Sequence, residues 1–169
     1  MDKIDKNSVA LAGEFAVLSQ LVLRGYNANM TLGNTKSIDI LVSDSRKDRM
    51  FKLEVKTSFG SKPSRSKLFG YTLSWMMTEK HESIFDKNLY YCFVNIEKQT
   101  NIFRFFIVPS VVVAEYVKIQ HRLWLNRNPN LSDKDKKIPM RQFRIGLEDE
   151  DYQISTSLAK DFENKWEFN

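Results

Sequence analysis

Three side chains that can bind a cation or transfer a proton stand in the stretch from Ser37 to Ser58. Asp39 carries one carboxylate, and Glu54 and Lys56 add a second carboxylate and an amine, separated by one residue. Carboxylate oxygens are hard ligands that suit Mg²⁺ and similar divalent ions. Two facing carboxylates repel each other unless a positive charge lies between them. If folding brings Asp39 to Glu54, these residues predict a divalent-cation site.

Two strands have to place these side chains, and the hydrophobic pattern predicts both. Apolar and polar residues alternate on either side of residues 43–49, which is typical of strands with one buried face. Residues 43–49 are all polar and suit a hairpin turn. A register that pairs the apolar residues places Asp39 opposite Glu54 on the other face, with Lys56 two residues along. The apolar pairs in this register are Ile38 with Val55, Ile40 with Leu53, and Val42 with Phe51.

Composition limits the classes of protein to consider. The 169 residues are enough for one domain with a core, so we expect a single domain over residues 1–169. A net charge of +5 favours polyanionic partners. The single cysteine, Cys92, excludes an internal disulfide and fits a reducing compartment. We see no apolar run of membrane-spanning length and no secretory signal, so we expect a cytoplasmic protein without a membrane partner.

A helix is predicted over residues 8–24, with Asn7 or Ser8 as its cap and Gly25 just past its end. Its apolar residues recur at helical spacing and predict a stripe that faces the core. The stripe comprises Leu11, Phe15, Leu18 and Val22. Glu14 lies on this helix and either points to water or belongs to a functional site, and the pattern alone leaves both interpretations open.

A composition change at residues 59–70 predicts a mobile loop, because the segment contains glycine, proline and serine. Its cations Lys62, Arg65 and Lys67 are either phosphate-binding or merely solvated. A short helix is predicted at residues 71–80, with Trp75 in the core rather than as a platform for a nucleic-acid base. His81 and His121 have no partner at metal-ligand spacing, so we expect no zinc site.

The second half of the chain contains two nearly continuous apolar runs, at residues 89–96 and 102–108, which predict strands buried on both faces. Cys92 lies in the first run and is expected to be a small core residue. Ser110 is predicted to cap a helix that reaches about Leu125. Beyond it we expect a surface loop over residues 126–139, an edge strand at 140–145 and a terminal helix at 157–168.

The order of these features resembles the PD-(D/E)XK nuclease superfamily, the restriction-endonuclease-like fold. A helix with Glu14 is followed by strands that carry Asp39 and Glu54-Val55-Lys56, then by a helix and another strand. The resemblance covers about residues 8–108, and the ending LEVKTS is especially similar. It implies an α/β fold with a central mixed β-sheet of four to five strands flanked by helices, an αβββαβ core, and a helical C-terminal extension over residues 109–169.

The resemblance also implies an activity and its site. By this resemblance, Asp39, Glu54 and the backbone carbonyl of Val55 would bind Mg²⁺ or Mn²⁺, and Lys56 would orient the attacking water. Glu14 matches an acidic residue of archaeal Holliday junction resolvases that helps to organise the metal site. The implied partner is nucleic acid, DNA in preference to RNA, and a homodimer is compatible with it. Two alternatives stay open: a catalytically idle module on the same fold that binds nucleic acid or a protein, and an immunity-type protein that uses only the scaffold.

Overall fold

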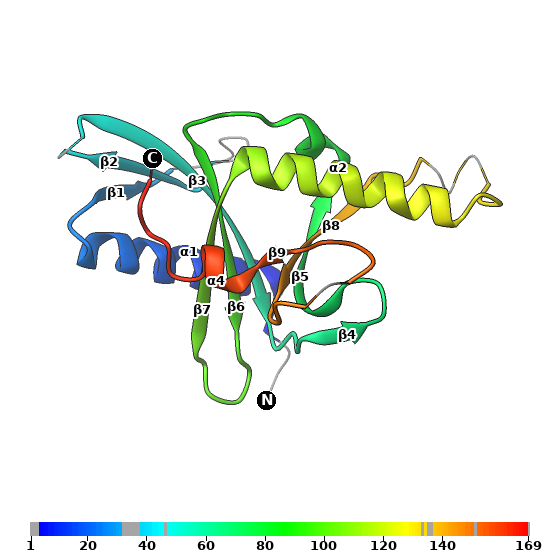
Figure 1. Ribbon diagram of the computed structural model, residues 1–169. Helices are drawn as coiled ribbons and strands as arrows, with labels where there is room; N and C mark the ends of the chain where they lie inside the picture. The colour runs from blue at the N-terminus through cyan, green and yellow to red at the C-terminus, as the bar shows by residue number, and fades with distance from the viewer. Residues whose placement is uncertain are drawn as a thin grey trace. The chain divides into compact units, whose positions relative to one another are not determined.

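The computed structural model describes residues 4–31, 38–45, 47–132, 134, 137–150 and 152–168. Its contacts divide the chain into two compact units. The first comprises residues 1–62, 87–109 and 160–169, and the second comprises residues 63–86 and 110–159. Each unit is built on its own β-sheet (Figure 1). The single domain expected over residues 1–169 stays a prediction. No helix in the described ranges is long and apolar enough to cross a membrane.

The first unit contains a five-stranded mixed sheet in the order β1-β2-β3-β6-β7. The strands β3 and β6 run parallel, whereas the other neighbours are antiparallel. This sheet confirms the predicted fold class, a mixed α/β fold with a central sheet of four to five strands. The bounds are β1 Asn27–Met30, β2 Ile40–Asp44, β3 Arg49–Phe59, β6 Leu89–Ile96 and β7 Phe103–Pro109.

The strand register predicted from hydrophobic alternation is confirmed between β2 and β3. Ile40 lies opposite Leu53 and Val42 lies opposite Phe51, and all four side chains are fully buried. The backbone N–H of Asp39 continues the pairing, because it donates to the carbonyl oxygen of Leu53 at 2.8 Å. The burial of the apolar face therefore determines which residues point to the opposite face.

Helix α1 (Lys6–Leu23) has a different buried face from the predicted one. Gly13, Val17 and Leu21 face the sheet, and Leu18 packs partly against the core. The other members of the predicted stripe are exposed, namely Leu11 (45%), Phe15 (54%) and Val22 (56%). The helix also starts earlier than expected, since the Asp5 side chain caps it by accepting from the backbone N–H groups of Asn7 and Ser8.

A close approach of helix α1 to strand β3 explains this rotation. A Cβ atom on Gly13 would lie 1.9 Å from Oγ1 of Thr57 and 2.9 Å from its Cβ atom. Only glycine allows the helix to lie so near the strand. Glu14 follows Gly13 in the chain, so the contact of Gly13 with Thr57 also fixes the position of the Glu14 backbone near strand β3.

Gly13→Ala is expected to lower the free energy of unfolding by about 1–3 kcal/mol, because the added methyl group overpacks the contact with Thr57. Chemical denaturation measures this effect. The double variant Gly13→Ala/Thr57→Ala should lose less stability than the sum of the single changes. Ser19→Ala, on the exposed face of the same helix, serves as the control and should be nearly neutral. Equal stability of Gly13→Ala and the wild type would contradict the contact.

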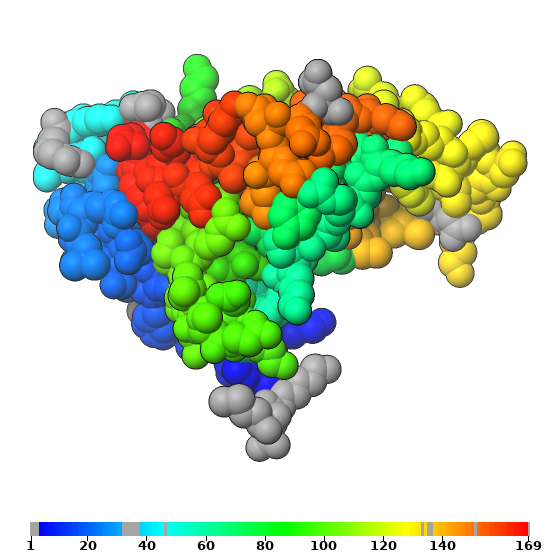
Figure 2. All heavy atoms as spheres, turned by 60° about the horizontal axis from the view of Figure 1, so that its bottom comes forward, coloured from blue at the N-terminus to red at the C-terminus, as the bar shows by residue number. Residues whose placement is uncertain are grey.

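The C-terminal residues 160–168 do not form the predicted long helix. Helix α4 spans only Ala159–Phe162, and Asn164 adopts a left-handed backbone with φ 56°. Trp166 and Phe168 are instead buried in the core of the first unit. Tyr26 donates its hydroxyl hydrogen to the carbonyl oxygen of Trp166 at 2.9 Å. Figures 1 and 2 show the red C-terminal segment beside the blue and cyan N-terminal elements of the same unit.

The second unit contains a four-stranded sheet in the order β4-β5-β8-β9. Strand β5 covers the segment predicted as a short helix, and its alternating residues Leu73, Trp75 and Met77 are buried. The core position predicted for Trp75 is confirmed. Strand β8 was expected at an edge but lies between β5 and β9, so residues 109–169 are not purely helical. The bounds are β4 Ser64–Ser66, β5 Gly70–Thr78, β8 Met140–Gly146 and β9 Ser157–Leu158.

Helices complete the second unit. Helix α2 spans Ser110–Arg127, so it begins at Ser110, the residue predicted to cap it, and extends past the predicted end near Leu125. A short 3-10 helix, η1, spans Glu79–Ser83. The Ser110 hydroxyl accepts a hydrogen bond from the backbone N–H of Asp86 at 3.1 Å and donates to its carbonyl oxygen at 2.7 Å. The resemblance predicts a helix between the third and fourth strands of an αβββαβ core. In the structure β4, β5 and η1 lie between β3 and β6 instead of that helix.

Candidate active site

Asp39 is held against strand β3 by its own backbone and side chain. Its N–H donates to Leu53, and its Oδ2 atom accepts a hydrogen bond from the N–H of Val55 at 2.6 Å. The carboxylate is therefore fixed next to the backbone that joins Glu54 to Lys56. Charge-assisted hydrogen bonds of this kind are short and orient the carboxylate.

Glu54 and Lys56 point to the same face of β3 because residues two apart in a strand share a face. The Nζ atom of Lys56 lies 2.5 Å from Oε1 of Glu54. The Glu54 side chain is 3% exposed and that of Lys56 is 29% exposed. A charge as buried as that of Glu54 requires a partner, and Lys56 supplies one. A buried carboxylate with an ion-pair partner shows that this face of β3 is more than a solvated strand surface.

Tyr91 is a site residue that the sequence interpretation missed. It lies directly beside Glu54 in the parallel pairing of β3 with β6 and is 1% exposed. Burial raises the pKa of Tyr91, and the Glu54 carboxylate beside it raises this pKa further. The phenol therefore stays protonated next to the carboxylate. A buried tyrosine hydroxyl normally needs a polar partner, and this was the available signal within the apolar run of β6.

The charges of Glu14, Asp39, Glu54 and Lys56 act on one another. Burial raises the pKa of Asp39, the Glu54 charge raises it further, and the Val55 hydrogen bond and the Lys56 charge lower it. Burial and the charge of Asp39 raise the pKa of Glu14, while Lys56 lowers it. The structure thus brings the four predicted residues into one electrostatic group in the first unit, with Glu14 contributed by α1.

The donor set of this group suits Mg²⁺ better than a metal that needs many protein ligands. The described part of the chain contains no group of three or more His, Cys, Asp or Glu side chains placed to hold a metal ion. Asp39 and Glu54 offer two carboxylates, and the backbone carbonyl of Val55 directly follows Glu54 in the sequence. Magnesium keeps several waters and is commonly held by one or two carboxylates together with substrate phosphates. The residues present fit that mode of binding.

The predicted phosphate-binding cations lie on exposed positions of residues 62–67. Arg65 belongs to strand β4 and not to a mobile loop. It forms an ion pair with Glu148, and its guanidinium lies over the ring of Tyr71 at 5.1 Å from the centroid. Its charge is therefore already compensated in part. A phosphate-binding role for Lys62, Arg65 and Lys67 stays a prediction.

Comparisons with known proteins bear on the fold. No protein-family model matches the chain, and no curated protein matches its sequence. Solved structures that match it include the bacterial homing endonuclease I-Ssp6803I. The two chains are 12% identical with a TM-score of 0.56, and the match covers 97% of this chain and 90% of the other. The chain described here therefore shares its fold with this endonuclease.

Proposed function

We propose that this protein is a metal-dependent nuclease of the PD-(D/E)XK type that hydrolyses phosphodiester bonds in DNA. One observation carries the proposal: the 2.6 Å hydrogen bond from Val55 to Asp39 places this carboxylate beside the Glu54–Lys56 ion pair. The fold shared with an endonuclease is a second support. Two buried or half-buried carboxylates and an amine in one place are costly for stability, which is typical of a functional site.

In this proposal Asp39, Glu54 and the backbone carbonyl of Val55 hold Mg²⁺ or Mn²⁺. When bound, the ion would lower the pKa of a coordinated water and stabilise negative charge on the phosphate oxygens. Glu14 places a further negative charge near Asp39 and thereby increases the attraction of the site for a cation. Tyr91 is buried beside Glu54 and stays protonated, so it adds no competing charge to the site.

Lys56 is proposed to act on the attacking water and on the phosphoryl group rather than on the cation. Its ammonium group is a compact charge with three donors, so it can hold the attacking water in place and stabilise the charge that develops on the phosphoryl group. The ion pair with Glu54 keeps Nζ at the site before substrate binds. Preorganised charge of this kind needs no rearrangement when the reaction occurs.

Cleavage assays test the proposal directly. The purified protein should cut supercoiled, linear, single-stranded or branched DNA with Mg²⁺ or Mn²⁺ and should be inactive with EDTA. A parallel series with RNA of the same sequences tests the preference for DNA. No cleavage of any substrate with either ion would contradict the proposal. Binding that weakens linearly with the logarithm of salt concentration, without cleavage, would instead favour the idle binding module.

A further inference from the structure

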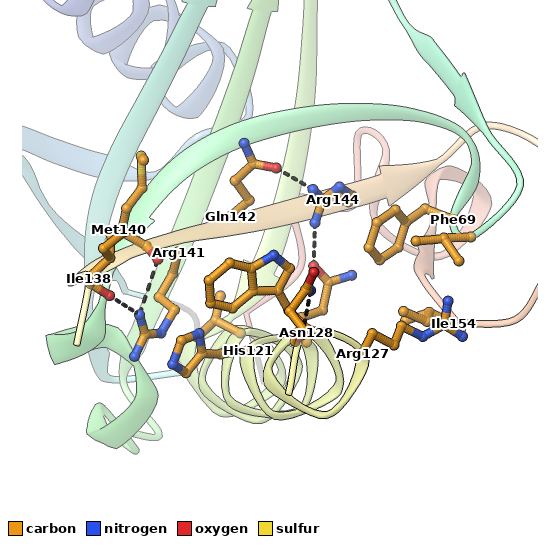
Figure 3. A pocket seen from close by; sticks show the side chains of 14 residues that line it. Phe69, His121, Arg127, Asn128, Ile138, Met140, Arg141, Gln142, Arg144 and Ile154 are labelled. Atoms are coloured by element: carbon orange, nitrogen blue, oxygen red, sulfur yellow. Dashed lines mark hydrogen bonds between the residues drawn. The ribbon is translucent and has the colours of Figure 1, made fainter. Parts of the chain in front are cut away.

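The second unit contains a pocket of about 620 Å³ that the proposed nuclease site does not use. Helix α2, strand β8 and the segment Leu68–Phe69 form its walls (Figure 3). Apolar side chains line much of it, and a pocket of this size suits a small organic molecule or one or two nucleotides. These apolar residues are Leu68, Phe69, Val117, Ile138, Met140 and Ile154.

The polar lining of the pocket is positively charged. Among the fourteen lining residues three are arginines and none is an aspartate or glutamate. Arg141 is buried and forms an ion pair with Glu82. Arg144 donates to the amide oxygens of Gln120 and Gln142, as the dashed lines in Figure 3 show, and Arg127 donates to the amide of Gln153 at 2.9 Å. Neutral amides orient these two guanidinium groups without cancelling their charge, so the pocket favours an anion.

The same pocket has an aromatic surface. Trp124 lines it and is 40% exposed, whereas the other two tryptophans, Trp75 and Trp166, are buried. The rings of His121 and Trp124 are stacked at 5.7 Å between centroids. Planar bases stack on exposed aromatic rings of this kind, and arginines nearby attract the phosphate.

We propose that this pocket binds a nucleotide whose base is unstacked, with the base against Trp124 and its phosphate near Arg127 and Arg144. The amides of Asn128 and Gln142 line the pocket and can bond to the edge of the base. The inference deepens the proposed function, because it rests on a nucleic-acid substrate and requires that the substrate presents an unpaired base. A free mononucleotide has the same chemistry, and the experiment separates these two sources.

Tryptophan fluorescence tests the pocket independently of cleavage. Binding is measured in EDTA with a short single-stranded oligonucleotide, the same strand with abasic sites, a blunt duplex and AMP. The oligonucleotide with bases should quench the emission, and the abasic strand and the duplex should not. Trp124→Phe should abolish the quenching, because Trp75 and Trp166 are buried. Stronger quenching by AMP than by the oligonucleotide, at equal nucleotide concentration, would support the pocket and assign it to free nucleotides.

Affinity measured by fluorescence anisotropy of the labelled oligonucleotide gives the second readout. Trp124→Ala should weaken binding by about tenfold or more, whereas Trp124→Phe should retain most of the affinity. Arg127→Gln should weaken it less and reduce its salt dependence. Circular dichroism and melting temperature verify that the variants are folded. Equal affinity for the abasic strand, or unchanged affinity of Trp124→Ala, would overturn the proposal.

The plasmid assay distinguishes this failure from failure of the nuclease proposal. Cleavage with unchanged fluorescence would contradict only the pocket proposal. Base-dependent quenching without cleavage would contradict only the nuclease proposal.

Discussion

Asp39→Asn is expected to lower the cleavage rate by about a hundredfold or more, the usual cost of losing a preorganised charge at a reacting centre. The variant keeps a side-chain oxygen that can accept the hydrogen bond from Val55. The position of the side chain should therefore be retained while its negative charge is lost. Loss of activity can then be attributed to weaker cation binding and not to a displaced strand.

The same substitution is expected to stabilise the protein at neutral pH. The pKa of Asp39 is raised in the folded state, chiefly by burial. A carboxyl group with a raised pKa contributes stability that is fully present below its unfolded pKa of about 4 and is lost as the pH rises through the folded pKa. Asparagine carries no charge and avoids this loss, so its advantage should disappear in acid. Loss of activity together with a gain in stability is common at functional sites.

Asp48→Asn provides the matched control for both effects. Asp48 lies on the same hairpin, is exposed, and has a positive φ of 48° that asparagine tolerates. This variant should leave cleavage and stability nearly unchanged. Thermal melts without divalent ions, from about pH 4 to pH 8, measure the stability difference, and the plasmid assay measures the rate. An active Asp39→Asn enzyme would contradict its assigned role.

Lys56→Met is expected to lower the cleavage rate by about a hundredfold or more and also to destabilise the protein. Glu54 would then keep a buried charge without its nearest cation, which costs about 1–3 kcal/mol or more. Lys56→Arg should not restore the rate, because a planar guanidinium cannot replace a compact ammonium group. Denaturant unfolding in EDTA measures the stability loss, and single-turnover cleavage measures the rate.

Two comparisons show whether the Lys56 effect arises from Glu54. The double variant Glu54→Gln/Lys56→Met should regain part of the lost stability, because the buried charge is removed with its partner. Mn²⁺ should raise the melting temperature of Lys56→Met more than that of the wild type, because the ion replaces the missing positive charge. Lys52→Met, on the same face of β3, is the control and should cleave at nearly the wild-type rate. Wild-type stability of Lys56→Met would contradict a functional ion pair.

The hairpin and its register were predictable because both strands alternate strictly around a polar turn. Once Ile40 pairs with Leu53, the pleat alone places Asp39 beside Glu54. Tyr91 was not identified, because the parallel pairing of β6 with β3 joins segments far apart in the chain. Its role depends on a register that no local pattern contains.

Two errors in the helix predictions have physical causes. The orientation of α1 depends on the contact of Gly13 with Thr57, and helical periodicity alone favoured the larger apolar residues of the opposite face. Residues 71–80 were interpreted as a helix, although Leu73, Trp75 and Met77 alternate as in a strand. Leucine and methionine also favour helices, so local propensity was ambiguous until pairing with β8 resolved it.

The helix predicted at the C-terminus was wrong for a third reason. Its residues 157–168 have helical spacing, yet Trp166 and Phe168 are more stable in the core of the first unit than on a solvated helix. Long-range burial of two large aromatic rings outweighs a weak local preference. Such contacts depend on the whole fold and are absent from any local window of sequence.

Calorimetric titration with Mn²⁺ tests the central claim, that Asp39 and Glu54 share a divalent cation. The account predicts saturable binding to the wild type, loss of that binding in Asp39→Asn, and unchanged binding in Asp48→Asn. No saturable binding to the wild type, or equal affinity in Asp39→Asn, would contradict it.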